Sequence, residues 1–300
     1  MPNRRDFSAA AAMTLLGGTF LPALPVFAQS SRFKARNALA NKWLQALEVM
    51  AQGRLGVHII DTATSHEFGF RQNERFMMLS SFKWMACAVV LARVDAGVEA
   101  LERRIVYSPQ DLVDYSPITS KYANGEGMTL AQLCDATITT SDNTAANLIL
   151  ASYGGPAALT ALARKVGDSV TRLDRIEPAL NVKLHEVLLD TTSPRAMAQT
   201  MQKVVLGDVL SASSRAVLQR WLLANTTGGK RLKAGLPAAW QTGDKTGTNQ
   251  TDSNDIAVIW PPDRKPWLVT AYVADSPARS DVRDATLAQV GGLVQELATL

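Results

Sequence analysis

The chain has 300 residues, of which 47% are hydrophobic and 19% charged, enough for one large core or two smaller lobes. This composition excludes a disordered chain, and the counts of 19 glycines and two cysteines exclude a collagen-like chain and a disulfide scaffold. The net charge is +4, but the Lys and Arg residues are scattered, which argues against a nucleic-acid partner.

The first 28 residues predict a cleaved export signal. Arg4 and Arg5 precede an apolar run over residues 9–24, and the V-F-A segment at residues 26–28 is typical of a cleavage site. A membrane anchor is the alternative, but the run is shorter than the roughly 20 residues that a span needs. The residues around the two arginines resemble a twin-arginine signal, and an ordinary secretory signal is the other possibility. We therefore expect residues 29–300 to form an exported protein, periplasmic or secreted, that does not associate with a membrane.

Apolar spacing predicts the elements of this mature chain. A helix, two strands and an almost wholly apolar helix are expected first, at residues 34–50, 55–61, 67–71 and 82–94. Helical patterns separated by loops then continue to about residue 223. Three strands and a closing helix follow, at residues 239–246, 255–260, 267–273 and 284–297. Strands at both ends predict one sheet built from the two ends of the chain, with a helical lobe inserted between them.

This pattern divides the chain into two lobes. We expect an α/β lobe from residues 29–75 and 224–300 and a helical lobe from residues 76–223, within one catalytic domain. A site between the lobes is the natural place for chemistry.

Several kinds of chemistry are excluded by missing motifs. His58, His66 and His185 have no metal-ligand spacing with another His or Cys. The chain also lacks a G-x-S-x-G nucleophile elbow, a P-loop and a dinucleotide fingerprint. We therefore expect no metal and no cofactor.

A serine and a lysine stand three residues apart at the start of the second apolar helix. Helical spacing places Ser80 and Lys83 on one face. Free N–H groups at a helix N-terminus favour a developing oxyanion, and a desolvated lysine can act as a base toward a hydroxyl. The alternative is a capped helix with a surface lysine. The same spacing at Ser31 and Lys34 has no such meaning.

Two further motifs favour the catalytic interpretation of Ser80 and Lys83. An S-D-N segment at residues 141–143 lies between two helical patterns, where a helix cap is the alternative interpretation. A K-T-G-T segment at residues 245–248 lies on a late strand, where an edge strand with a solvated lysine is the alternative. Together the three motifs resemble those of class A β-lactamases and penicillin-binding proteins.

The resemblance to class A β-lactamases covers essentially the whole mature chain. It is carried by residues 114–150, 172–181, 190–200 and 221–261, and it is closest to the cefotaximase-like, extended-spectrum branch. It implies a two-lobed α/β fold, an antiparallel sheet flanked by helices with an inserted all-helical lobe. It also implies a monomer that hydrolyses the β-lactam ring of penicillins and cephalosporins through an acyl-serine, which confers antibiotic resistance.

Two other functions share the first three motifs. A D-alanyl-D-alanine peptidase is one, but such peptidases lack the deacylating pair that Glu177 and Asn181 match. A β-lactam-binding sensor, which would stay acylated, is the other. The absence of a second domain argues against it.

The resemblance assigns a catalytic role to each matching residue. Ser80 is the acylated nucleophile, and Lys83 assists it as a base. Ser141 relays a proton to the leaving nitrogen, and Glu177 with Asn181 holds the water that hydrolyses the acyl-enzyme. Whether Lys83 or Glu177 activates Ser80 is left open.

The resemblance also implies a set of substrate-binding residues. Lys245, Thr246 and Thr248 bind the substrate carboxylate, and the backbone N–H groups of Ser80 and Thr248 form the oxyanion hole. We favour Arg231 over Arg283 as a further carboxylate ligand, with a solvated charge as the alternative for either. The complete set is Asn143, Asn181, Lys245, Thr246, Gly247, Thr248, Tyr115 and Arg231. Tyr115 forms a wall of the site in this view, or is simply a packed aromatic.

Two regions carry additional expectations. Cys87 and Cys134 could pair in an oxidising compartment or stay separately buried, and they match a pair that is bridged in several family members.

Arg175 and Asp190 match a buried ion pair that closes the loop carrying Glu177. Between them, residues 185–189 replace the family's usual Pro-Gly or Pro-Asn turn, which predicts a looser loop that admits bulky cephalosporins at some loss of deacylation speed.

Overall fold

A computed structural model describes residues 26–184 and 187–300, with side chains from residue 33 onward. The chain divides into two units, Met1–Ala35 and Arg36–Leu300, and all candidate site residues belong to the second. The predicted signal peptide lies outside the described residues except for its last three, with which the first helix begins.

The helices occur in chain order, and their bounds are α1 Val26–Ala51, α2 Lys83–Asp95, α3 Leu130–Thr139, α4 Asn143–Ser152, α5 Pro156–Lys165, α6 Pro194–Met201, α7 Ala212–Leu223 and α8 Ser280–Thr299. The shorter helical segments are η1 Leu79–Phe82, η2 Pro109–Asp111, η3 Thr119–Lys121, η4 Ala179–Asn181, η5 Gln202–Leu206 and η6 Leu232–Gly235. The strands are β1 Arg54–Asp61, β2 His66–Phe70, β3 Phe76–Met77, β4 Arg104–Ile105, β5 Met128–Thr129, β6 Thr191–Thr192, β7 Gln241–Thr248, β8 Ser253–Trp260 and β9 Trp267–Ala274.

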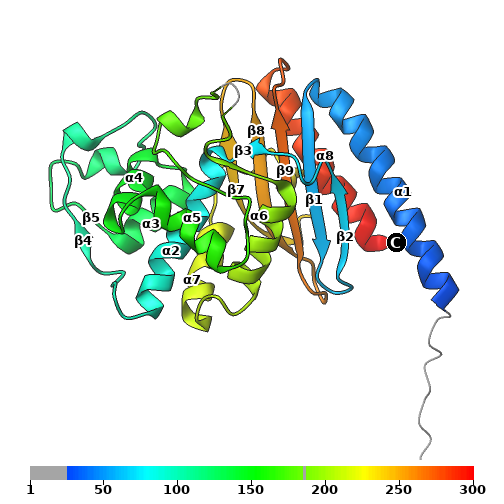
Figure 1. Ribbon diagram of the computed structural model, residues 1–300, viewed down its shortest axis with the longest axis horizontal. Helices are drawn as coiled ribbons and strands as arrows, with labels where there is room; N and C mark the ends of the chain where they lie inside the picture. The colour runs from blue at the N-terminus through cyan, green and yellow to red at the C-terminus, as the bar shows by residue number, and fades with distance from the viewer. Residues whose placement is uncertain (1–25, 185–186) are drawn as a thin grey trace, which may run out of the picture. The chain divides into compact units, whose positions relative to one another are not determined.

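The main sheet has five strands in the order β2-β1-β9-β8-β7, and every pair is antiparallel. Successive side chains alternate between its faces, as a period of two requires. Val57 and Ile59 point into a core shared with α8, whereas Ile60 points into the core of the helical lobe. Figure 1 shows α8 on one face of the sheet, where residues 40–51 of α1 share its core, and α6 with the helices of the other lobe on the opposite face.

Helix α2 is the centre of the helical lobe. Every residue from Lys83 to Leu91 is buried, which explains its continuous apolar sequence. It packs against α3, α4, α5 and α7. Because η1 leads directly into α2, the segment that carries Ser80 is fixed by the packing of this central helix.

The predicted fold class is confirmed: strands from both ends of the chain form one antiparallel sheet, and helices from the middle form a second layer (Figure 1). The lobe boundaries remain a prediction. The two-stranded pairs β3–β6 and β4–β5 were not predicted, because two residues are too short to show a period. In the described part of the chain no single helix could cross a membrane, although the bent pair of α4 and α5 passes by length and composition.

Candidate active site

Ser80 and Lys83 lie where η1 passes into α2. Leu79 has a φ of 48°, a left-handed conformation that is rare for a branched residue and marks local backbone strain just before Ser80. Lys83 is completely buried at the first position of α2. The predicted helix start is therefore correct, and the alternative of a surface lysine is wrong.

The S-D-N segment joins α3 to α4. Asp142 caps α4 by accepting a hydrogen bond from the N–H of Ala145 at 2.8 Å, so the cap interpretation also holds. Ser141 has a φ of 63°, and its carbonyl oxygen accepts a hydrogen bond from Lys83 Nζ at 2.8 Å. Asn143 Oδ1 accepts another from the same nitrogen at 2.6 Å. Asp142 therefore caps α4, whereas Ser141 and Asn143 contact the buried Lys83.

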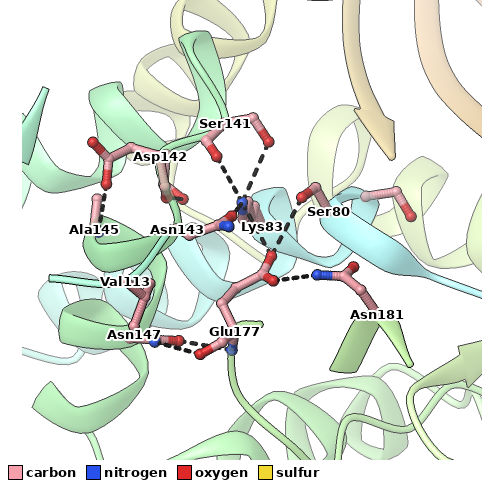
Figure 2. Close-up of polar contacts among 12 residues, drawn as sticks. Ser80, Lys83, Val113, Ser141, Asp142, Asn143, Ala145, Asn147, Glu177 and Asn181 are labelled. Atoms are coloured by element: carbon pink, nitrogen blue, oxygen red, sulfur yellow. Dashed lines mark hydrogen bonds and ion pairs between the residues drawn. The ribbon is translucent and has the colours of Figure 1, made fainter. Parts of the chain in front are cut away.

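Glu177 connects the nucleophile to this cluster. Its Oε1 accepts a hydrogen bond from Ser80 Oγ at 3.3 Å and lies 3.2 Å from Lys83 Nζ (Figure 2). Its Oε2 accepts a hydrogen bond from Asn181 Nδ2 at 2.5 Å. The Asn147 side chain bonds both the N–H and the carbonyl of Glu177, each at 2.9 Å. The carboxylate is thus held from its backbone and from both of its oxygens.

The K-T-G-T segment forms the end of β7, an edge strand of the sheet. Lys245 is nonetheless fully buried, so the alternative of a solvated lysine is wrong. Its Nζ donates hydrogen bonds to Ser141 Oγ and to the Thr246 carbonyl, both at 3.0 Å. Gly247 is required for packing, because a Cβ there would lie 2.3 Å from Asn254 Oδ1 and 2.8 Å from Leu79 Cβ.

The two arginines have different surroundings. Arg231 Nη2 donates to Thr248 Oγ1 at 2.7 Å, and the guanidinium also pairs with Asp284 at 2.7 Å. Arg283 donates instead to Ser253 Oγ at 3.0 Å and to the Ala278 carbonyl at 2.6 Å. The geometry therefore favours Arg231 as the arginine of the site.

These elements surround a cleft of about 330 Å³. Its lining residues are Ser80, Tyr115, Ser141, Asn143, Asn181, Thr227, Arg231, Thr246, Gly247 and Thr248. Tyr115 is 61% exposed and lines the opening, so it is not a packed aromatic. Lys83, Glu177 and Lys245 lie behind this lining and reach it through Ser80 and Ser141.

Burial changes the proton affinity of both lysines. It lowers the pKa of Lys83, and the neighbouring Glu177 carboxylate opposes that shift. Burial, together with the positive charge of Lys83, lowers the pKa of Lys245 to about 7. Two lysine side chains with lowered pKa values therefore lie close to one serine hydroxyl, that of Ser141.

The sequence reasoning missed two residues at the site. Asn147 anchors the backbone of Glu177, and Thr227 lines the cleft with its hydroxyl 2.5 Å from that of Thr246. Asn147 is a polar residue inside an otherwise apolar helical pattern, which is a signal that could have been used. Thr227 lies in a polar loop, where its sequence context carries no such signal.

Cys87 and Cys134 are both buried and lie close together, here as free thiols, and their pairing in an oxidising compartment stays a prediction. Cys87 Sγ lies 3.7 Å from the Cys134 carbonyl oxygen, and burial raises the pKa of the Cys87 thiol well above its usual value. Among the described residues, no cluster of His, Cys, Asp or Glu side chains could hold a metal ion.

Comparison with known proteins finds β-lactamases by family model and by sequence identity. The model of a family described as the β-lactamase enzyme family matches residues 39–297. The chain is 43% identical to Beta-lactamase L2 of Stenotrophomonas maltophilia, covering 97% of each protein. It is 42% identical to Beta-lactamase CTX-M-97 of Escherichia coli, covering 92% of this chain and 95% of the relative.

Solved structures agree with the sequence relatives. An ancestral class A β-lactamase is 56% identical with a TM-score of 0.84, covering 86% of this chain and 99% of that one. A putative class A β-lactamase from Rhodopseudomonas palustris is 52% identical with a TM-score of 0.83, covering 87% of this chain and 99% of that one. The chain therefore belongs to the β-lactamase enzyme family, in class A.

Proposed function

We propose that this class A enzyme hydrolyses β-lactams through an acyl-Ser80 intermediate, with the residues of the cleft in the following roles. The substrate carboxylate binds to Lys245, Thr246 and Thr248, next to the Arg231 guanidinium. Asn143 holds the substrate's side-chain amide. One hydrogen of its Nδ2 bonds the Asp114 carbonyl at 2.9 Å, which leaves the second for the substrate. Tyr115 forms the outer wall.

In the acylation step, Ser80 Oγ bonds to the lactam carbonyl carbon. The backbone N–H groups of Ser80 and Thr248 stabilise the oxyanion. The serine proton passes to the Glu177 carboxylate or to the neutral form of Lys83, and both residues belong to the buried cluster. The carbon–nitrogen bond then breaks, and Ser141 gives its proton to the leaving nitrogen.

The position of Ser141 suits this relay. Its Oγ accepts hydrogen bonds from Lys83 at 3.3 Å and from Lys245 at 3.0 Å, so its own hydrogen is available to the leaving group. Lys83 then returns a proton to Ser141, and where Glu177 took the serine proton, Lys83 regains it from that carboxyl group across their 3.2 Å contact. The net result is that the proton lost by Ser80 reaches the lactam nitrogen.

In the deacylation step, Glu177 takes a proton from a water molecule, whose oxygen attacks the ester carbonyl. Asn181 orients this carboxylate through the 2.5 Å hydrogen bond to Oε2. The proton then returns to Ser80, and the open-ring acid leaves. The observation that carries the proposal is the placement of Glu177 Oε1 within hydrogen-bonding reach of both Ser80 and Lys83.

Intact-protein mass spectrometry with excess benzylpenicillin, followed in parallel by lactam absorbance, tests the proposal. The expected result is many turnovers with the parent mass regained at the end. The Ser80→Ala variant should form no adduct and show no turnover. A stoichiometric adduct that persists on the parent enzyme would contradict the role of Glu177, and hydrolysis by Ser80→Ala would contradict the nucleophile.

We further propose that the mature chain is an exported monomer in the periplasm or outside the cell. In an oxidising compartment the adjacent Cys87 and Cys134 would then become a disulfide. Alkylation of the denatured, exported protein followed by mass measurement tests this: a disulfide protects both thiols until a reductant is added. Two alkylated cysteines without reductant would contradict the pairing, and light scattering would measure the oligomeric state.

A further inference from the structure

The carboxylate-binding end of the cleft has two threonine hydroxyls on β7 with different hydrogen-bond partners. Thr248 Oγ1 accepts a hydrogen bond from Arg231 Nη2 at 2.7 Å, so its own hydrogen remains available to a ligand. Thr246 Oγ1 instead lies 2.5 Å from Thr227 Oγ1, in the turn that precedes Arg231. One of these two hydroxyls must donate the hydrogen of this bond.

The surroundings of Thr227 decide which one donates. Its hydroxyl lies 2.9 Å from Asn225 Oδ1, and its backbone N–H donates to the same oxygen at 3.1 Å. Asn225 Nδ2 donates to Asp244 Oδ2 at 2.5 Å, so the orientation of this amide is fixed from both ends. A hydroxyl has a single hydrogen. Because Thr227 donates its hydrogen to Asn225, Thr246 must donate to Thr227.

The turn that holds Thr227 is itself firmly attached. The N–H and the hydroxyl of Thr226 both donate to the Thr139 carbonyl, at 2.9 and 2.7 Å. Gly228 lies against the Asp244 carboxylate so closely that a Cβ would come within 1.9 Å of Oδ2. The Thr227 hydroxyl is therefore a fixed acceptor for Thr246.

We infer that Thr227 is a positioning residue that limits the affinity of the cleft for the substrate carboxylate. This inference rests on the proposed function, in which Thr246 donates a hydrogen bond to that group. In the free enzyme Thr246 presents lone pairs toward an incoming anion. Binding therefore requires both hydroxyls to turn, so that Thr227 donates to Thr246 and Asn225 loses one of its two hydrogen bonds.

The test compares the isosteric Thr227→Val variant with the conservative Thr227→Ser variant. Stopped-flow acylation by benzylpenicillin gives the dissociation constant of the non-covalent complex and, separately, the acylation rate constant. Thr227→Val should lower the dissociation constant about threefold to tenfold, the range for one hydrogen bond, and change the rate constant less than about twofold. Thr227→Ser should match the parent. Thr299→Val, the same substitution at the exposed end of α8, is the control and should also bind like the parent.

A second pair of variants tests whether Thr227 acts through Thr246. In Thr246→Val the hydroxyl that Thr227 restrains is absent, so adding Thr227→Val should no longer tighten binding. Unchanged or weaker binding in Thr227→Val alone, or equal tightening in the Thr246→Val background, would overturn the inference. Failure of the parent enzyme to acylate would instead refute the proposed function, and this inference with it.

Discussion

The segment between α5 and α6 has two arms that differ in how they are held. In the first arm, residues 172–181, Arg175 Nε lies 2.6 Å from Asp190 Oδ2, and Asn147 binds the backbone of Glu177. In the second arm, residues 182–189, Val182, Leu184, Val187 and Leu188 are all exposed by 43 to 58%. The charged side chain of Lys183 pairs with Asp275 at the surface.

This difference shows what positions the catalytic carboxylate. Asp190 is fully buried and also accepts hydrogen bonds from the N–H groups of Asp174 and Arg175, at 2.7 and 2.9 Å. Buried polar contacts of this kind are worth more than contacts at the surface. Glu177 is therefore placed by its own arm and by α4, rather than by packing of the second arm.

Replacing the carboxylate itself gives the largest expected effect. An amide at position 177 cannot take the proton of the attacking water, so Glu177→Gln should reduce kcat for benzylpenicillin by about 10³-fold. Mass spectrometry should show the penicilloyl adduct accumulating on Ser80. Glu126→Gln, at an exposed position, is the control and should turn over like the parent. Rapid deacylation by Glu177→Gln would mean that another group activates the water.

Removing the charge of Asp190 should give the largest loss of stability. Asp190→Asn leaves Arg175 without its buried anion, and we expect the free energy of unfolding in urea to fall by about 3 kcal/mol. The matched control is Asp275→Asn at the surface, where the carboxylate is 42% exposed and pairs with Arg54 and Lys183. Its loss should stay below about 1 kcal/mol. Equal losses would show that burial does not distinguish the two arms.

The pH dependence of the dissociation constant tests the side of the cleft that carries Lys245. Burial and the charge of Lys83 hold the pKa of Lys245 at about 7. Lys245 is therefore a cation below pH 7 and loses its charge above it. The dissociation constant for benzylpenicillin should then rise as the pH passes 7, approaching tenfold per pH unit.

The bound carboxylate raises the pKa of Lys245, so the acylation rate at saturation should stay level to a higher pH than the dissociation constant does. Asp244 and Asp255 favour the charged form, and Arg231 opposes it. Lys245→Arg keeps the cation at all these pH values and should abolish the rise. A rise that persists in Lys245→Arg would assign it to another group.

The sequence predicted most of the scaffold because long, periodic segments record which face is buried. The apolar run at residues 82–94 and the strands at 255–260 and 267–273 each match an observed element within a few residues. It did not predict that Lys245 is buried on an edge strand, because the cover comes from distant parts of the chain. It also missed Thr227 and Asn147, whose roles depend on hydrogen bonds that span 19 and 30 positions. Motifs identify the reacting groups, whereas the residues that orient them become visible only in three dimensions.

The smallest effect is expected in the second arm, where the family's usual turn is absent. The triple variant His185→Pro, Glu186→Gly and Val187→Asp restores a Pro-Gly-Asp sequence at residues 185–187, of which the first two lie outside the described residues. Because proline reduces the freedom of open states, turnover of a bulky cephalosporin such as cefotaxime should fall about two- to fivefold, whereas benzylpenicillin turnover should stay equal or rise as deacylation recovers. Val187 is 49% exposed, so its replacement removes no core contact. Val187→Asp alone introduces the charge without the turn and should leave both rates as in the parent. Equal cefotaxime turnover in the parent and the triple variant would show that this arm does not set the width of the site.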